Sequence, residues 1–173
     1  MSDVAKISEY LEVEPPPFHR TAFVPLLGKV SGGRNEAVLF GENGGPIDWI
    51  ALPARSAPAR GALEVEGDSM RGIAGHGFIA FIGEKHEPPT TDQIEQLCVC
   101  GLPGGQRVVK FLHASKYPNR FDLFSSNDEP LLAQAVDWAA VVTNIVPASQ
   151  AGTLARRSEA SDDHVFLNFE NTG

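Results

Sequence analysis

Short apolar segments recur along this chain about every ten residues, and turn-forming residues separate them. The chain of 173 residues contains 17 glycines and 13 prolines, which supply many of these turns. Segments of this length, rich in β-branched and aromatic residues, are typical of strands. The pattern predicts an all-β fold, either a folded antiparallel sheet or a partial barrel, with strands near 24–30, 37–40, 49–52, 62–65, 78–82, 97–101, 107–113, 121–124 and 139–146.

Length and composition favour one folded domain. At 173 residues with 42% hydrophobic content, the chain can bury a sizeable core, and a single domain is the usual outcome at this size. Three successive prolines near the start interrupt a short helical pattern and are typical of an extended linker. We therefore expect an N-terminal segment with a proline-rich linker over 1–21, the domain over 22–148, and a polar, mostly disordered tail over 149–173.

The charge of the chain excludes some functions. Its formal net charge of −8 argues against direct nucleic-acid binding, because contacts to phosphates need a basic face. The N-terminus does not have the pattern of a secretory signal, and no apolar run approaches the ~18 residues of a membrane span. The sequence predicts a cytoplasmic protein without membrane contact.

Cysteines and histidines give little indication of a metal site. Cys98 and Cys100 would share one face of a strand, where a disulfide would be strained, so we interpret them as small buried hydrophobic residues. We expect no metal and no cofactor. The five histidines are scattered, at His19, His76, His86, His113 and His164.

A serine follows the expected strand 62–65, in the turn Gly67-Asp68-Ser69-Met70. A serine hydroxyl is a weak nucleophile at neutral pH and needs a neighbouring base to take its proton. The same residues are also ordinary turn formers, so the motif alone does not establish catalysis.

Lys110 lies within the β-prone run 107–112 and could be that base. A neutral lysine amine can replace histidine, and burial lowers the pKa of a lysine by up to ~3–5 units. Alternation along a strand would place Lys110 with Val108 and Leu112. Two alternatives remain. Lys110 could be a charge on an edge strand that discourages aggregation, or His113 could pair with the serine, although it would face away from Lys110.

The order of these features resembles peptidase family S24, the LexA and phage CI-type repressors, which also includes UmuD. The resemblance covers roughly 22–148 and is carried by Val24–Gly33, Ile47–Pro53, Val65–Met70, Gly75–Phe81, the Lys110 strand, Leu123–Pro130 and Trp138–Val146. It implies a LexA-like peptidase fold with Ser69 as nucleophile, Lys110 as general base, and Asp68 and Met70 as positioning residues. The Ser69 amide would be a donor to the oxyanion.

The resemblance also implies that the substrate is the chain itself. The matching bond is Gly32-Gly33, with Ser31-Gly32 as the neighbouring choice. Gly32 departs from the family, which more often has alanine or cysteine before the scissile glycine. A second glycine adds backbone entropy that must be lost, so we expect slow or partner-dependent cleavage. The segment 84–90 is expected to be a loop inserted relative to the family.

These implications define two functional hypotheses. The first is a self-cleaving Ser-Lys peptidase and dimerisation domain of an SOS-type or prophage transcriptional repressor, with a homodimer and a RecA-type co-protease as partners. The second is an S24-like dimerisation or partner-binding module in which cleavage is slow or absent. The chain would be either the C-terminal portion of a longer repressor or a stand-alone module arranged like UmuD.

Overall fold

The fold is known from a computed structural model, which describes residues 21–31, 46, 48–54 and 56–157. Several predictions lie outside these residues and stay predictions. They are the N-terminal segment and linker up to residue 20, the strand at 37–40, the Gly32-Gly33 bond, and the tail from residue 158 onward.

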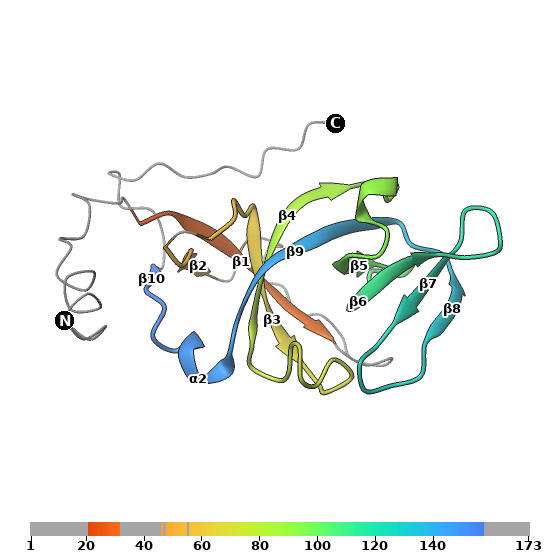
Figure 1. Ribbon diagram of the computed structural model, residues 1–173. Coiled ribbons are helices and arrows are strands. Elements are labelled where there is room, and N and C mark those ends of the chain that lie inside the picture. Colours follow the sequence, from red (N-terminus) through yellow and green to blue (C-terminus); the bar gives the residue numbers. More distant parts are fainter. Residues whose placement is uncertain (1–20, 32–45, 47, 55, 158–173) are drawn as a thin grey trace, which may run out of the picture.

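The prediction of an all-β fold is confirmed. The described residues form ten strands, together with a 3-10 turn, η2 (Thr91–Gln93), and a short helix, α2 (Ala148–Ala151) (Figure 1). The strands are β1 (Phe23–Ser31), β2 (Asp48–Ala51), β3 (Gly61–Glu66), β4 (Ile79–His86), β5 (Leu97–Gly101), β6 (Arg107–Ala114), β7 (Phe121–Phe124), β8 (Leu131–Gln134), β9 (Trp138–Val146) and β10 (Arg156–Arg157).

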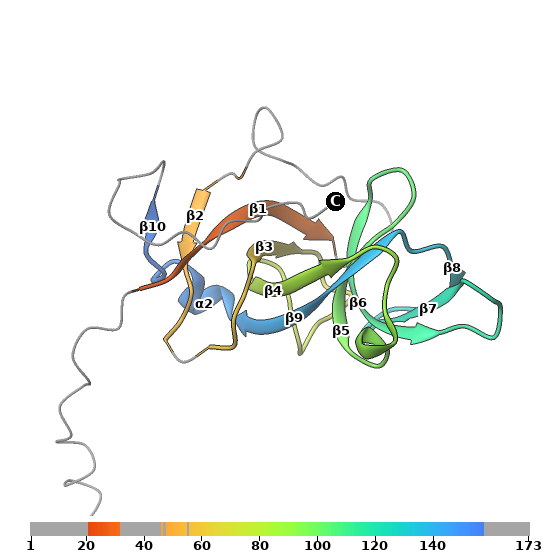
Figure 2. The same ribbon diagram turned by 90° about the horizontal axis from the view of Figure 1, so that it is seen from above.

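All ten strands belong to one sheet, in the order β10-β2-β1-β3-β4-β9-β5-β6-β7-β8. Figures 1 and 2 show β10 and β2 at one end of the molecule and β7 and β8 at the other. Neighbours are antiparallel except for β1 and β3, which run parallel. The expected antiparallel sheet is therefore a mixed one, because β1 enters it between β2 and β3 in the direction of β3.

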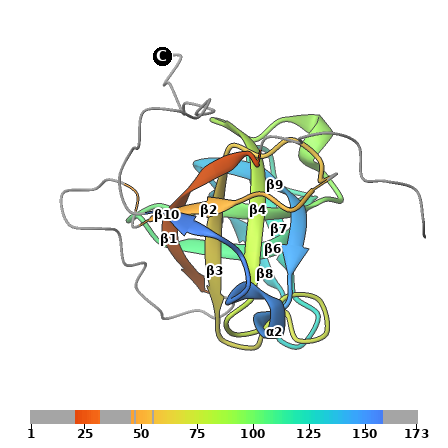
Figure 3. The same ribbon diagram turned by 90° about the vertical axis from the view of Figure 1, so that its left-hand side faces the viewer.

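The sheet curls enough for β1 to meet β6, which lies five positions away in strand order. The two strands run parallel and pair at one point, Ser31 opposite Val108. Figure 3, a view from the β10 end, shows the strands of this curved sheet one behind another. The end of β1 is thereby brought between the strand that precedes the serine turn and the strand that carries the lysine.

Buried side chains form three clusters along the sheet. The cluster nearest the serine turn contains Val30 from β1, Val65 from β3, Met70 from the turn and Val109 from β6, all fully buried. The turn and both flanking strands therefore share one core, which fixes their relative positions.

Two boundaries differ from the prediction. The segment 84–90 is not wholly a loop, since β4 continues to His86, which pairs with Ala139 of β9. The strand end was not predicted because it contains charged residues and is half-buried or exposed, so it lacks the apolar pattern of a strand. Beyond 148 the fold continues through α2, whose Ala151 is buried, to β10, which pairs with β2. No helix among the described residues is long and apolar enough to cross a membrane.

Candidate active site

The serine turn begins where β3 ends. Gly67 has a φ of 80°, a conformation that glycine adopts without steric cost, and this lets the chain turn away from the sheet. The Arg71 amide donates to the Asp68 carbonyl at 2.9 Å and closes the turn around Ser69. Met70 is fully buried in the core, so the residue after the serine anchors the turn.

Lys110 lies inside the sheet. Its strand, β6, has β5 on one side and β7 on the other, and the residue is only 2% exposed. Val108 and Leu112, its neighbours on the same face, are fully buried. The alternative of a solvated charge on an edge strand is therefore wrong, because β6 is not an edge and its lysine is not solvated.

The fold brings the lysine to the serine. Lys110 Nζ donates a hydrogen bond to Ser69 Oγ at 2.7 Å, although the two residues are 41 positions apart in the sequence. Ser69 is 4% exposed, so both partners are shielded from water. Burial penalises the ammonium form of a lysine, and a neutral amine at this distance can take the hydroxyl proton. The pair has the geometry of a nucleophile with its general base.

A donor for an oxyanion is available at the same turn. Within the described part of the chain, no carbonyl accepts a hydrogen bond from the Ser69 amide N–H. An amide of this kind next to the nucleophile can stabilise negative charge on the attacked carbonyl oxygen, and one such donor is worth about 3–4 kcal/mol of barrier. The turn therefore contains both a hydroxyl next to a lysine amine and an amide of the kind that can contact an oxyanion.

Ser125 is a site residue that the sequence reasoning missed. Lys110 Nζ also donates to Ser125 Oγ, at 2.6 Å. Its place depends on the register of two strands, which the pattern of a single strand does not specify: Phe124 of β7 pairs with Phe111 of β6. In an antiparallel pair the residue after Phe124 comes level with the residue before Phe111, which is Lys110. A polar residue at that position was therefore within reach of the lysine.

The two predicted positioning residues act in different ways. Met70 holds the turn in the core, as described above. The carboxylate of Asp68 is largely exposed and pairs with Arg71 at 2.7 Å. Its backbone carbonyl accepts from the Arg71 amide and from Asn127 Nδ2. Asp68 therefore supports the turn through its backbone and an external ion pair.

The end of β1 lies beside both halves of the candidate site. Ser31, the last described residue of this strand, pairs with Glu66 of β3 and with Val108 of β6. Glu66 precedes the serine turn, and Val108 lies two residues before Lys110. The predicted cleavage bond, Gly32-Gly33, follows directly in the sequence and lies outside the described residues.

The remaining candidates for chemistry are placed elsewhere. His113 packs edge-on against Phe124, with ring centroids 4.8 Å apart, on the strand that presents Lys110 to the serine. Cys98 and Cys100 are free and buried, and burial raises the pKa of both thiols, that of Cys98 to about 12. Among the described residues, no three histidine, cysteine, aspartate or glutamate side chains are grouped to hold a metal ion.

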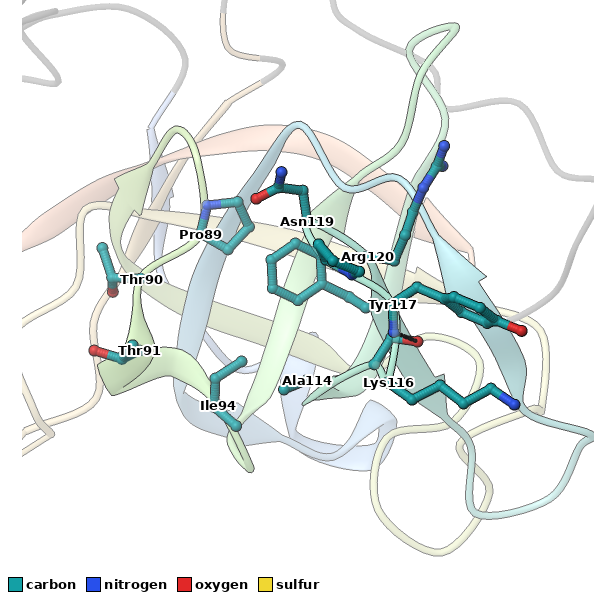
Figure 4. Close-up of a pocket in the computed structure, with 12 residues that line it drawn as sticks. Pro89, Thr90, Thr91, Ile94, Ala114, Lys116, Tyr117, Asn119 and Arg120 are labelled. Carbon is teal, nitrogen blue, oxygen red and sulfur yellow. Dashed lines mark hydrogen bonds between the residues drawn. The ribbon is translucent and has the colours of Figure 1, made fainter.

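A surface pocket of about 410 Å³ lies beyond the far end of β6 (Figure 4). Residues 89–91 and Ile94 form one wall, and the β6–β7 turn, residues 114–121, forms the other. Neither Ser69 nor Lys110 lines it. The pocket is therefore separate from the candidate active site.

Comparisons with models of protein families and with curated proteins gave no match for this chain. The geometry around Ser69 and the order of motifs in the sequence are consequently the grounds for inferring a function.

Proposed function

We propose that this protein is a self-cleaving Ser-Lys peptidase of the S24 type, which cuts its own chain near Gly32-Gly33. The observation that carries the proposal is the 2.7 Å hydrogen bond between the buried Lys110 amine and the Ser69 hydroxyl. A serine in a turn and a lysine in a strand are each common when they occur separately. A shielded pair at hydrogen-bond distance is an arrangement expected of a catalytic dyad.

Two features favour the chain itself as the substrate. Ser69 is almost fully covered, which disfavours access by large external substrates. The described end of β1 is paired next to both dyad strands, one residue before the predicted bond begins. A tethered peptide reaches a high effective concentration at the nucleophile, so cleavage requires no separate binding step.

In the proposed reaction the Ser69 proton moves to Lys110 Nζ while Ser69 Oγ bonds to the carbonyl carbon of Gly32. The Ser69 amide stabilises the resulting oxyanion. The bond between the Gly32 carbonyl and the Gly33 nitrogen then breaks, and the lysine returns the proton to the leaving amine. Water hydrolyses the remaining ester, with Lys110 again taking a proton.

The experiment follows the intact mass of the purified chain at neutral pH and at pH ~9–10, where more Lys110 is neutral. The wild-type protein should lose its intact mass faster at the higher pH. Ser69→Ala and Lys110→Ala should each slow this loss by roughly 10³-fold or more. The matched control Ser115→Ala, a half-buried serine in the β6–β7 turn, should cleave like the wild type.

We further propose that cleavage is the switch of an SOS-type or prophage transcriptional regulator, acting as a homodimer and assisted by a RecA-type co-protease. The motif order described under Sequence analysis supports this role. If the wild type and Ser69→Ala both keep their intact mass at every pH, the peptidase proposal is wrong. The S24-like binding module would then be the better hypothesis.

A further inference from the structure

The Lys110 amine is held between two hydroxyl groups. It donates to Ser69 Oγ at 2.7 Å and to Ser125 Oγ at 2.6 Å. Ser125 comes directly after β7, the antiparallel neighbour of β6, and is half-buried. The second hydroxyl is thus as close to the amine as the proposed nucleophile is.

The residues after Ser125 hold the serine turn. Ser126 Oγ donates to the Arg71 carbonyl at 2.9 Å, and the Asn127 amide donates to the Ser69 carbonyl at 2.8 Å. Figure 1 shows the connection after β3 and the connection after β7 together at the lower side of the molecule. One tripeptide, Ser125–Asn127, therefore contacts both halves of the dyad.

We propose that Ser125 is a positioning residue, which fixes the direction of the Lys110 amine, and that the Ser125–Asn127 tripeptide sets the distance between the amine and Ser69. This inference rests on the proposed peptidase function. A lysine side chain is flexible and its amine rotates freely, so one hydrogen bond does not fix the orientation of its lone pair. A second hydrogen bond, donated by Nζ to Ser125 Oγ, leaves the lone pair directed at the Ser69 proton.

The proton balance follows from this arrangement. Before attack the amine is neutral, so the hydrogen bond to Ser69 reverses: Nζ carries two hydrogens, donates one of them to Ser125 Oγ, and accepts the Ser69 hydrogen with its lone pair. After attack, Nζ carries three hydrogens and a positive charge, and Ser125 Oγ still accepts one of them. Because a hydroxyl oxygen stabilises an ammonium more than an amine, Ser125 also assists the charge that develops on Lys110.

The first test compares Ser125→Ala, Ser125→Thr and the control Ser115→Ala in the full chain by the rate of self-cleavage across pH. Ser125→Ala should slow cleavage about 10- to 100-fold, as expected for a misdirected base. Its pH profile should move to lower pH, because the ammonium loses an acceptor. Ser125→Thr should restore most of the rate and the profile. A merely structural effect would slow cleavage without moving the profile, and that result would overturn the inference.

The second test does not require cleavage. In the Ser69→Ala background, the titration of Lys110 is followed by NMR in protein with ¹³C-labelled lysine, with and without Ser125→Ala. The midpoint should shift to lower pH when Ser125 is removed, even if the wild type proves not to cleave. An unchanged midpoint would overturn the positioning role while leaving the peptidase proposal standing.

A third test assigns the nucleophile. Covalent labelling of the wild type by a serine-reactive phosphonate should fall on Ser69, and labelling of Ser125 instead would reverse the assigned roles.

Discussion

At the scale of single residues, the most unusual choice in this chain is a lysine in the interior of the sheet. Lys110 is 2% exposed and lies among fully buried valine and leucine side chains. Burying an amine costs free energy even when it is hydrogen-bonded, and an apolar side chain of similar length would pack there at lower cost. Because a stable fold does not need a lysine at this position, a role as a base for Ser69 is the simplest explanation for it.

We therefore expect function and stability to separate at Lys110. In the non-cleaving Ser69→Ala background, Lys110→Met should lower the free energy of unfolding by no more than about 1 kcal/mol, because an apolar side chain of similar volume replaces a buried polar one at little cost. Urea unfolding at neutral pH measures the difference. A loss of several kcal/mol would mean that Lys110 is a structural residue first.

The two cysteines give a prediction about reactivity. Burial raises the pKa of the Cys98 thiol to about 12 and raises that of Cys100 as well, so neither is a thiolate near pH 8. A thiol reagent at about pH 8 should label the native protein slowly and label both cysteines once the protein is unfolded in urea. Rapid labelling of the native state would show that the β5 strand opens easily.

Gly101 gives a prediction about packing. A β-carbon at this position would overlap the indole ring of Trp138, which Lys85 and Arg107 flank with cation–π contacts at 5.1 and 5.6 Å. Gly101→Ala should therefore lower the free energy of unfolding by about 1–3 kcal/mol. Gly152→Ala, where the added carbon meets open space, is the matched control and should change it by less than about 0.5 kcal/mol.

At the scale of elements, the positions of the strands in the sequence were easier to predict than the strands with which each one pairs. Eight of the nine expected strands overlap strands of the structure, and the ninth, at 37–40, lies outside the described residues. Local alternation and turn residues carry this information. Alternation and turn residues do not determine which strands pair, so the position of β1 between β2 and β3, parallel to β3, was not predicted. β8 was missed because it is short, at the edge of the sheet, and half-exposed.

In the candidate site, too, local sequence features could be predicted and the pairing of strands could not. Ser69 and Lys110 could be named from residue type and motif order, whereas the edge-strand alternative for Lys110 could be removed only by knowing that β5 and β7 flank it. Ser125 was missed because its role depends on the register of β7 against β6. Register is a non-local property, and the pattern of one strand does not specify it.

The contact between β1 and β3 gives a pH prediction. Lys29 Nζ is 2.6 Å from the Glu66 carboxylate, and this hydrogen bond, with the nearby charge of Glu64, raises the pKa of Lys29 above 10.5. A raised pKa means that the ion pair contributes fully below pH ~10.5 and is lost as the pH rises through the folded value. The pair should therefore stay intact in cleavage assays at pH ~9–10.

Lys29→Met tests this expectation. The variant should unfold at a slightly lower urea concentration than the wild type at neutral pH, and the difference should shrink as the pH rises through the raised pKa of Lys29, where the wild-type lysine also loses its charge. Both proteins carry Ser69→Ala so that cleavage does not intervene. A difference that is constant across this pH range would mean that packing, and not the ion pair, supports the β1–β3 contact.

At the scale of the whole molecule, the candidate site is assembled from three separate parts of the chain. The turn after β3 supplies Ser69, the middle of β6 supplies Lys110, and the connection after β7 supplies Ser125. The curl of the sheet brings the end of β1 to the same place. Such a site exists only in the folded state, so cleavage should stop when the protein unfolds.

Self-cleavage of the folded chain by Ser69 and Lys110 is the main proposal. Its most direct measurement is mass spectrometry of the wild-type chain held at pH ~9–10, over a range of protein concentrations. We predict fragments that correspond to residues 1–32 and 33–173, formed at a rate that does not depend on protein concentration and absent in Ser69→Ala. Fragments that also form in Ser69→Ala, or a wild-type chain that stays intact, would contradict the account.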